Sequence, residues 1–311
     1  MHGVLIIDKP AGPTSHDVVA RVRRAIGISR IGHTGTLDPL ATGVLALVVG
    51  RATRLAQFLS VDEKEYVAGV RLGWATATYD AEERTTRGEG GELKVLPPDR
   101  PAPPIDRNTV TAALADFTGT YQQMPPPFSA KKVGGTPAYL LARLQKNVEL
   151  KPAAVNVSAL ELLGYDDGLA TLRIVSSSGF YVRALAHDLG RRLGCGAHLE
   201  SLRRTRAGDF HQAAATPLAV VQAEGVQALT RLVPLGSLLS KLPQVVVNQR
   251  GAERAAHGNA LASEHLSEAA LEAAIAGELA GPVRVLDADG ALLAIGQAGR
   301  GGVLQPIVVL V

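Results

Sequence analysis

The segment from Gly32 to Gly43 constrains the fold of this chain more than any other part of the sequence. It contains three glycines, three threonines and one proline in twelve residues. Glycine permits positive φ, proline fixes φ, and threonine hydroxyls form local hydrogen bonds. This composition predicts a loop of one defined shape that presents a single carboxylate, Asp38. Taken alone, an Asp-Pro pair in a loop is most often a turn former.

The pattern on both sides of this loop predicts an α+β fold. Short apolar or alternating runs predict strands at 4–8, 44–49, 65–72, 155–163, 169–175, 283–286 and 292–295. Helical periodicity appears at 109–117 and 181–193, and 218–239 is predicted to be largely helical. Thr14-Ser15-His16-Asp17 has the form of a helix-start box, and Gly27 marks the end of the helix that it predicts.

Charge is distributed unevenly along the chain. Residues 245–311 hold four basic and seven acidic residues, whereas residues 1–244 hold 28 basic and 22 acidic residues. Two segments, 14–54 and 183–206, each contain six arginines and two acidic residues. Such segments are candidates for contact with a polyanion, but ordinary solvated surfaces also contain them. Charge alone therefore leaves nucleic-acid binding open.

Several classes of protein are excluded by what the chain lacks. A single cysteine, Cys195, excludes an intrachain disulfide and the Cys-x-x-Cys zinc motif of nucleobase deaminases. The glycine-rich loop has no Gly-Lys-Ser/Thr, and no Gly-x-Ser-x-Gly nucleophile elbow occurs. Neither a signal peptide nor a membrane-spanning apolar run is recognisable, so we expect a cytoplasmic protein without membrane contact.

The loop at 32–43 resembles the signature of the TruB-type pseudouridine synthases, Gly-His-Thr-Gly-Thr-Leu-Asp-Pro-x-Ala-x-Gly, and matches every fixed position. Companion motifs resembling those of the family follow in the same order. They are Asp8-Lys9-Pro10 with Thr14-Ser15, Lys64-Glu65-Tyr66, the segments 123–130 and 139–143, Gly179-Phe180-Tyr181-Val182-Arg183, and Leu202-Arg203-Arg204-Thr205. The resemblance is strong over residues 3–210 and weak in the tail.

This resemblance implies the pseudouridine-synthase fold, an α+β architecture with a mixed, largely antiparallel central sheet, in a catalytic domain over residues 1–240. Residues 121–150 resemble the mobile insertion with which the family clamps RNA. Residues 245–311 resemble a small β-rich RNA-binding domain of the PUA type. Because this tail is acidic, we expect it to position RNA only weakly or sterically.

The activity that the resemblance implies is conversion of the tRNA T-loop uridine (position 55 of tRNA) to pseudouridine. The reaction exchanges a C1′–N1 bond for a C1′–C5 bond without redox change, so we expect neither a cofactor nor a metal. Asp38 would be the nucleophile, or a base that promotes a transient glycal. Arg183 would be the guanidinium partner that stabilises its charge. Tyr66 would stack on the uracil and is a candidate for the proton step at C5.

The resemblance also assigns binding residues. Tyr181 and Leu202 would complete the walls of the pocket, and His33 would fill the space that the flipped nucleotide leaves. Core packing is the ordinary alternative for each of these side chains. The basic side chains expected to contact RNA are those of Lys9, Arg21, Arg24, Lys131, Lys132, Arg203 and Arg204. Phe180 and Gln145 depart from the family pattern, and we expect Phe180 to alter the packing beside Tyr181.

Three interpretations of function remain open at this level. The first is a stand-alone enzyme that acts on the T-arm of tRNA as a monomer, with no obligatory protein partner. The second is an RNA-guided synthase of the dyskerin type, against which the long insertion and the short acidic tail argue. The third is a non-catalytic tRNA-binding or tRNA-folding protein, against which the joint presence of Asp38, Tyr66 and Arg183 argues.

Overall fold

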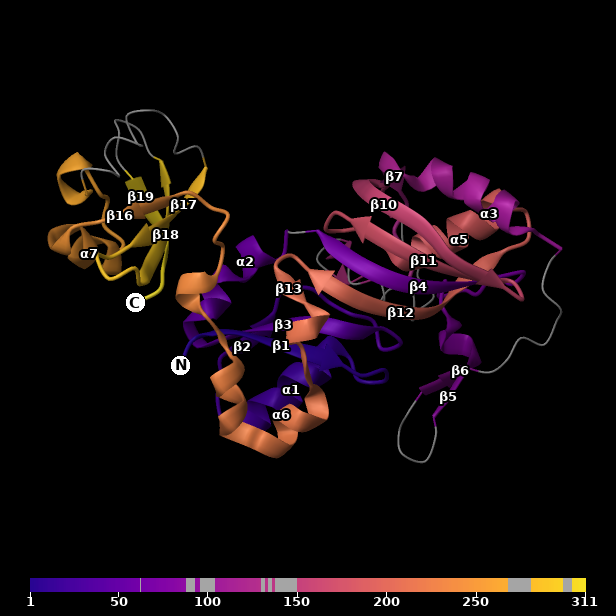
Figure 1. The fold of residues 1–311 in the computed structure, drawn as a ribbon, viewed down its shortest axis with the longest axis horizontal. Coiled ribbons are helices and arrows are strands. Elements are labelled where there is room, and N and C mark those ends of the chain that lie inside the picture. The colour runs from indigo at the N-terminus through magenta and orange to yellow at the C-terminus, as the bar shows by residue number, and fades with distance from the viewer. Residues whose placement is uncertain are drawn as a thin grey trace.

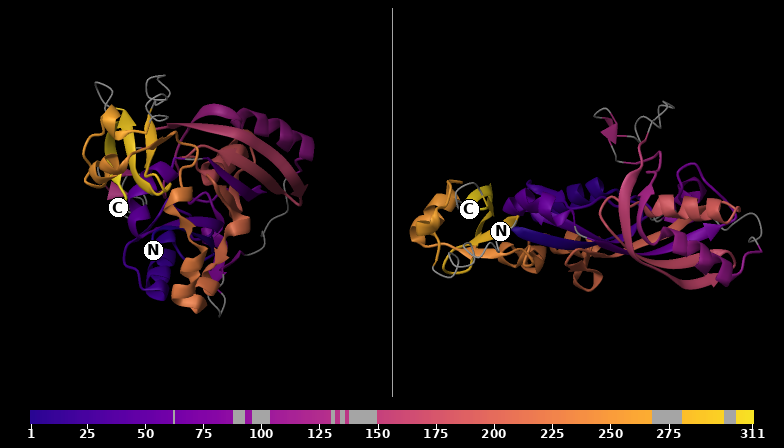
Figure 2. Two further views of the ribbon diagram at one scale, coloured as in Figure 1. Left: turned by 60° about the vertical axis from the view of Figure 1, so that its left-hand side comes forward. Right: turned by 90° about the horizontal axis from the view of Figure 1, so that it is seen from above.

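The structure is a computed structural model of the chain. It describes residues 1–61, 63–87, 93–95, 104–129, 132–133, 136–137, 150–267, 281–298 and 304–311. The molecule is elongated: a large sheet with helices occupies most of its length, and a small second sheet lies at one end (Figures 1 and 2). The predicted α+β class is confirmed.

The large sheet runs in the order β14-β1-β3-β12-β4-β11-β10-β7, with β2, β13 and β15 paired beside this path. Its pairs β1–β14 and β3–β12 are parallel and the others are antiparallel, which confirms the predicted mixed, largely antiparallel sheet. The strands are β1 (Gly3–Lys9), β2 (Ile31–His33), β3 (Thr42–Val49), β4 (Lys64–Leu72), β7 (Gly119–Gln123), β10 (Ala153–Asp166), β11 (Leu169–Ser176), β12 (Ala197–Ala207), β13 (Phe210–His211), β14 (Thr216–Pro217) and β15 (Val233–Pro234).

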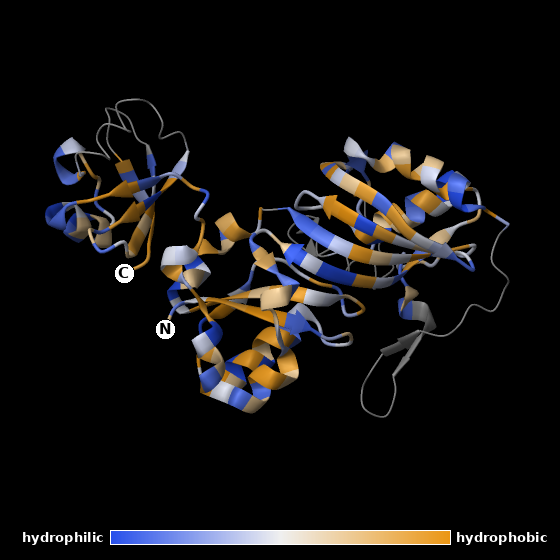
Figure 3. Ribbon diagram, viewed as in Figure 1, coloured by the Kyte–Doolittle hydropathy of each residue, from blue (hydrophilic) through white to orange (hydrophobic). Residues whose placement is uncertain are grey.

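Strands β1 and β3 are buried on both faces, which explains their continuous apolar runs (Figure 3). Leu5 and Leu45 point into the core shared with helices α1 (Ser15–Ile26) and α6 (Leu218–Glu224). Val4 and Val44 point into a second core on the opposite face. Successive side chains of a strand alternate between faces, so the two short strands serve two cores at once.

Helix α1 begins and ends as its sequence predicts. The Thr14 hydroxyl accepts the Asp17 N–H at 3.1 Å, and the Asp17 carboxylate accepts the Thr14 N–H at 2.9 Å. Gly27 closes the helix in the left-handed region at φ 70°. The remaining described helices are α2 (Ala56–Leu59), α3 (Arg107–Leu114), α5 (Val182–Arg192), α7 (Gln249–Ala256) and the short 3₁₀ turns η1 (Gly50–Leu55), η2 (Ala81–Arg84), η3 (Ala115–Phe117), η4 (Gln212–Ala214), η5 (Gly225–Arg231), η6 (Leu235–Ser237) and η7 (Ser263–His265).

The segment 218–239 is largely helical as predicted, but it is not one helix. Gly225 adopts φ 59° and ends α6, and the chain continues through the 3₁₀ helix η5, the short strand β15 and the 3₁₀ helix η6. Strand β12 was not among the predicted strands, although it lies in the middle of the sheet between β3 and β4. Its eleven residues include four charged ones, which hides the apolar alternation of a strand.

The small sheet has the order β16-β17-β18-β19, with β16 (Gln244–Val246), β17 (Pro282–Leu286), β18 (Leu292–Ala298) and β19 (Leu304–Val309). It has a core of its own with α7. Leu286, Leu292 and Ile295 also pack into the second core beneath β1 and β3, so the tail is docked on the large sheet. Two short pairs, β5 (Thr85–Arg87) with β6 (Leu93–Val95) and β8 (Lys132–Val133) with β9 (Thr136–Pro137), stand apart. No helix in the described ranges is long and apolar enough to cross a membrane.

Candidate active site

The loop that carries Asp38 connects β2 to β3 and is held by buried polar contacts. The Ser15 hydroxyl, at the start of α1, accepts the Leu37 N–H at 2.8 Å and donates to the Leu37 carbonyl at 3.1 Å. The Gly12 N–H donates to the Pro39 carbonyl at 2.8 Å. Because Gly12 lies between β1 and α1 and Ser15 is the first residue of α1, the start of this helix holds the loop immediately before and after Asp38.

Lys9 supports the same loop from inside the protein. Its side chain is fully buried, and Nζ donates to the carbonyls of Ala41 at 2.6 Å, Pro10 at 2.9 Å and Pro39 at 3.3 Å. Burial lowers the pKa of Lys9 to about 8. The prediction that Lys9 contacts RNA is therefore wrong, since the ammonium group is turned inward and its three donors are occupied by loop carbonyls.

Arg204, on β12, also holds the loop. It is 3% exposed, and its guanidinium donates to the carbonyls of Val44 at 2.7 Å and Gly35 at 3.1 Å. Arg204 also lines the pocket above the Asp38 loop, and its contact with RNA remains a prediction. The loop ends at Gly43, with φ 96°, where a Cβ atom would lie 2.2 Å from the Arg204 carbonyl oxygen. Only glycine fits at this close approach of β3 to β12.

Asp38 and Arg183 form a bidentate ion pair. Arg183 Nε donates to Asp38 Oδ2 at 2.9 Å, and Arg183 Nη2 donates to Asp38 Oδ1 at 3.2 Å. The arginine side chain is 7% exposed, whereas the aspartate side chain is 38% exposed. A planar guanidinium fork on a carboxylate fixes orientation as well as charge. The carboxylate is thus held by a buried partner while it remains accessible to a ligand.

Arg183 is itself fixed by three further groups. Its guanidinium donates to the carbonyls of Thr78 at 3.0 Å and Phe128 at 2.9 Å, and Nε lies 3.6 Å from Asp80 Oδ2. Asp80 is 5% exposed, and burial raises its pKa against the opposing effect of the Thr78 hydroxyl and Arg183. Sequence analysis missed Asp80, because an acidic residue after a Thr-rich turn has the same appearance as any turn residue.

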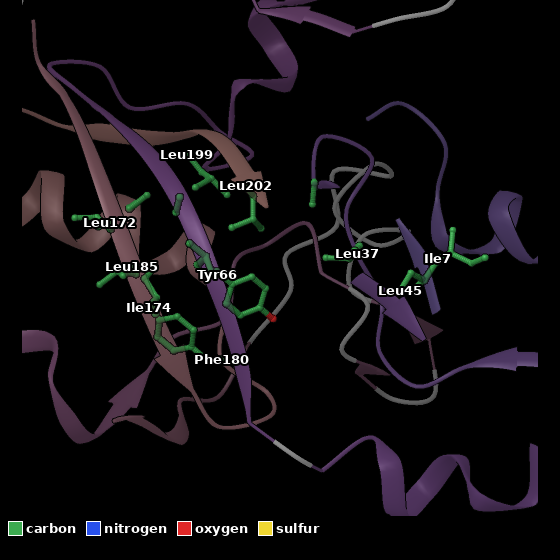
Figure 4. Packing of buried hydrophobic residues seen from close by; sticks show 14 of the residues in the cluster. Ile7, Leu37, Leu45, Tyr66, Leu172, Ile174, Phe180, Leu185, Leu199 and Leu202 are labelled. Atoms are coloured by element: carbon green, nitrogen blue, oxygen red, sulfur yellow. The ribbon is translucent and has the colours of Figure 1, made fainter. Parts of the chain in front are cut away.

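A pocket of about 310 Å³ opens above this ion pair. Six of the predicted site residues line it, namely Asp38, Arg183, Tyr66, Tyr181, Leu202 and Arg204. Tyr66 and Leu202 stand on the paired strands β4 and β12. Figure 4 shows the Tyr66 ring next to Leu202, with its hydroxyl toward the side on which Leu37 lies. The individual roles of these residues remain predictions.

Tyr181 forms the other wall from the residue that precedes α5. Its N–H donates to Gln123 Oε1 at 2.9 Å, and its carbonyl accepts from Gln123 Nε2 at 3.1 Å. Burial raises the pKa of the Tyr181 phenol. Phe180, the departure from the family pattern, is 9% exposed and belongs to the main core while it also lines the pocket. The effect of Phe180 on the packing beside Tyr181 remains a prediction.

His33 lies at the end of β2, one residue before the pocket lining begins at Thr34. Its ring packs edge-on against His16, with ring centroids 5.3 Å apart. Burial lowers the pKa of His33, and His16 and Arg204 act in the same direction. A neutral, partly buried imidazole suits a packing role better than proton transfer. Its contact with a flipped nucleotide remains a prediction.

The other residues predicted to contact RNA differ in their surroundings. Arg21 and Arg24 are exposed on α1. Arg203 is 40% exposed and forms a bidentate pair with Asp8 at 2.8 and 3.1 Å. Lys131 and the side chain of Lys132 lie outside the described residues, as does most of the predicted insertion at 121–150.

The fold is found in a solved complex. The chain is similar to a chain in the structure of an H/ACA RNP bound to a substrate RNA containing 2′-deoxyuridine, with a TM-score of 0.70 and 23% identity. The match covers 99% of this chain and 85% of that chain. This likeness concerns the fold, and together with the carboxylate loop it places the chain in the class of pseudouridine synthases.

Sequence comparison defines the family within that class. Residues 23–182 match the model of the TruB family pseudouridylate synthase N-terminal domain, and residues 183–240 match that of the tRNA pseudouridylate synthase B C-terminal domain. The tRNA pseudouridine synthase B of Solibacter usitatus is 42% identical over 100% of both chains. That of Thermobifida fusca is 42% identical over 99% of this chain and 98% of its own. The chain belongs to the TruB family of pseudouridylate synthases.

Proposed function

We propose that this protein isomerises a uridine in the T-loop of tRNA to pseudouridine, with Asp38 as the catalytic carboxylate. The observation that carries the proposal is the bidentate Asp38–Arg183 pair at the base of a pocket, with the arginine buried and the aspartate accessible. Relatives that are 42% identical over nearly the whole chain have the name tRNA pseudouridine synthase B, which supports tRNA as the substrate.

The chemistry required is an intramolecular transfer. Asp38 acts at the ribose, either by attack on C1′ or by removal of the C2′ proton to give a glycal, and the C1′–N1 bond breaks. The detached uracil turns so that C5 faces C1′, and the new C1′–C5 bond forms. In the first route the ester bond between Asp38 and C1′ breaks in this step, and in the second route the proton returns to C2′. The C5 proton then leaves to solvent or to a base. The uracil takes up a proton at N1, so the product is an isomer of the substrate.

The pocket supplies what this sequence of steps needs. Arg183 keeps the Asp38 carboxylate in one orientation through two hydrogen bonds. Tyr66 offers a ring for stacking on the uracil during its turn, with Leu202 behind it. A volume of about 310 Å³ fits a single nucleotide rather than a stacked loop. The target uridine must therefore leave its stack, as in other enzymes that act on bases.

RNA outside the pocket would be recognised mainly through its shape and phosphates. The exposed Arg21 and Arg24 side chains on α1 are suited to phosphate contact. In this proposal the protein acts in the cytoplasm as a monomer and needs no obligatory protein partner. The PUA-type role of residues 245–311 and the clamping role of the insertion belong to the same proposal.

The test is release of tritium from a T-stem-loop RNA labelled at C5 of its uridines. Release by the wild-type protein and none by Asp38→Asn, at similar RNA affinity, is the expected result. If neither protein releases tritium from an RNA that both bind tightly, the stand-alone activity is refuted. An RNA-guided synthase or a binding protein would give that outcome.

A further inference from the structure

The amide side chain of Gln123 joins the edge of the large sheet to the first turn of α5. Gln123 is the last residue of β7 and is 2% exposed. Its Oε1 accepts the Tyr181 N–H at 2.9 Å, and its Nε2 donates to the Tyr181 carbonyl at 3.1 Å. One side chain thus satisfies both backbone groups of a single residue. Tyr181 is the N-cap of α5, and no side chain of its own caps the helix.

This contact fixes the backbone that carries both the Tyr181 ring and the Arg183 guanidinium. The Tyr181 carbonyl also accepts the first helical hydrogen bond, from the Leu185 N–H at 3.2 Å. Arg183 lies two residues further on, in the first turn of α5. A shift of the Tyr181 backbone would therefore move the Tyr181 ring and the Arg183 guanidinium together.

The chain that follows Gln123 makes a second contact with the start of α5, this time with Arg183. Five residues later the Phe128 carbonyl accepts from Arg183 Nη2 at 2.9 Å. Between these contacts, Pro125 and Pro126 are buried. The segment 123–128 is thus anchored at both ends to the first turn of α5. It is also the base of the long connection between β7 and β10, which pair with each other in the sheet.

On the basis of the proposed function, we propose that Gln123 is a positioning residue for pseudouridine formation. It sets the first turn of α5 so that Arg183 meets Asp38 and Tyr181 faces the pocket. The base of the insertion and the catalytic arginine are thereby one unit.

Two substitutions test this role. Gln123→Met keeps the length of the side chain and removes both hydrogen bonds. Gln123→Glu keeps the acceptor for the Tyr181 N–H but, when ionised, places an oxygen against the Tyr181 carbonyl. When protonated, the glutamic acid can donate again and restore both bonds. Gln122→Met is the matched control, because Gln122 is the neighbouring residue on the same strand and is exposed.

The measurement is the single-turnover rate of tritium release at saturating T-stem-loop RNA, together with RNA affinity and the melting temperature. We expect Gln123→Met to lower the rate roughly 10- to 100-fold, since small displacements of catalytic groups have effects of that size. RNA affinity should stay within about twofold of the wild-type value, because the Gln123 side chain is buried and does not offer a surface to RNA. Gln122→Met should match the wild type in all three measurements.

The Gln123→Glu variant distinguishes positioning from general support of the fold. Its rate, divided by the wild-type rate at the same pH, should rise as pH falls from 8 to 5.5. A ratio that does not change with pH would overturn the proposal, as would a wild-type rate in a folded Gln123→Met protein. Loss of RNA affinity without loss of single-turnover rate would overturn it as well. Absence of tritium release by the wild-type protein would instead refute the proposed function, whatever the variants do.

Discussion

Substitution of Asp80 tests the geometry of the site most directly, because Asp80 is the second carboxylate beside Arg183. Its Oδ2 lies 3.6 Å from Arg183 Nε, and its Oδ1 accepts from the Thr78 hydroxyl at 2.7 Å and from the Glu82 N–H at 3.0 Å. In Asp80→Asn the amide oxygen can keep the last two contacts. The amide nitrogen then faces the guanidinium with a donor, so attraction is replaced by repulsion.

The expected effect on stability is small, because two large contributions oppose each other. At 3.6 Å and an effective dielectric constant near 20, the attraction to Arg183 is about 4 to 5 kcal/mol. Removing a carboxylate from water costs several kcal/mol, which offsets most of this attraction. Burial raises the folded-state pKa of Asp80, so its ionisation lowers stability as pH rises through that pKa. The free energy of unfolding of Asp80→Asn should therefore lie within about 2 kcal/mol of the wild-type value at neutral pH.

The expected effect on rate is large. Loss of one of its two carboxylates lets the Arg183 fork shift relative to Asp38, and we expect the single-turnover rate to fall roughly 10- to 100-fold. Tritium release measures the rate, and urea unfolding at pH 4 and pH 7 measures stability. Asp188→Asn is the control, because burial also raises the pKa of this carboxyl on the same helix as Arg183. A folded Asp80→Asn protein with the wild-type rate would refute the assignment of Asp80 as a support of Arg183.

Three further outcomes follow from the geometry of the loop and its supports. The pKa of Lys9 is lowered to about 8 in the folded protein, so the unfolded state binds this proton more tightly. The free energy of unfolding should therefore rise between pH 8 and 10. Urea unfolding should show this rise in the wild type and not in Lys9→Met. Gly43→Ala should lower the free energy of unfolding, measured with urea, by at least about 3 kcal/mol, because its Cβ would lie 2.2 Å from the Arg204 carbonyl oxygen. A decrease below about 1 kcal/mol would contradict that contact. In a double-mutant cycle on tritium release, Asp80→Asn and Gln123→Met should not be additive, because both act through one guanidinium, whereas independent effects would multiply.

The elements that the sequence predicted correctly are those whose pattern is local. Helix α1 has its own start and stop signals in Thr14, Asp17 and Gly27, and its boundaries follow from them. Strand β12 could not be found in this way. Its arginines are used for contacts with partners distant in sequence, such as Arg204 with Gly35 and Arg203 with Asp8. Those partners are defined only once the sheet has formed.

The same distinction applies to the site. The motifs identified Asp38, Arg183, Tyr66, Tyr181 and Leu202, and all five line one pocket. The prediction of an RNA contact was wrong for one basic residue, the fully buried Lys9. A buried cation that is bound to carbonyls has the same sequence signal as an exposed cation that binds phosphate. Burial, which decides between these outcomes, depends on the packing of β1 and β12 against the loop.

Arg183 explains why the site needs segments from so much of the chain. Carboxylates from residues 38 and 80 and carbonyls from residues 78 and 128 surround one guanidinium. The loop before β3, the turn after β4, the base of the insertion and the start of α5 must all be in place before these contacts exist. Because these groups hold the Arg183 guanidinium in place, it cannot shift with a displaced Asp38. The fold therefore determines where Asp38 can act. Among the described residues, Asp38 keeps an exposed side, and the pocket above it is bounded by Tyr66, Tyr181 and Leu202.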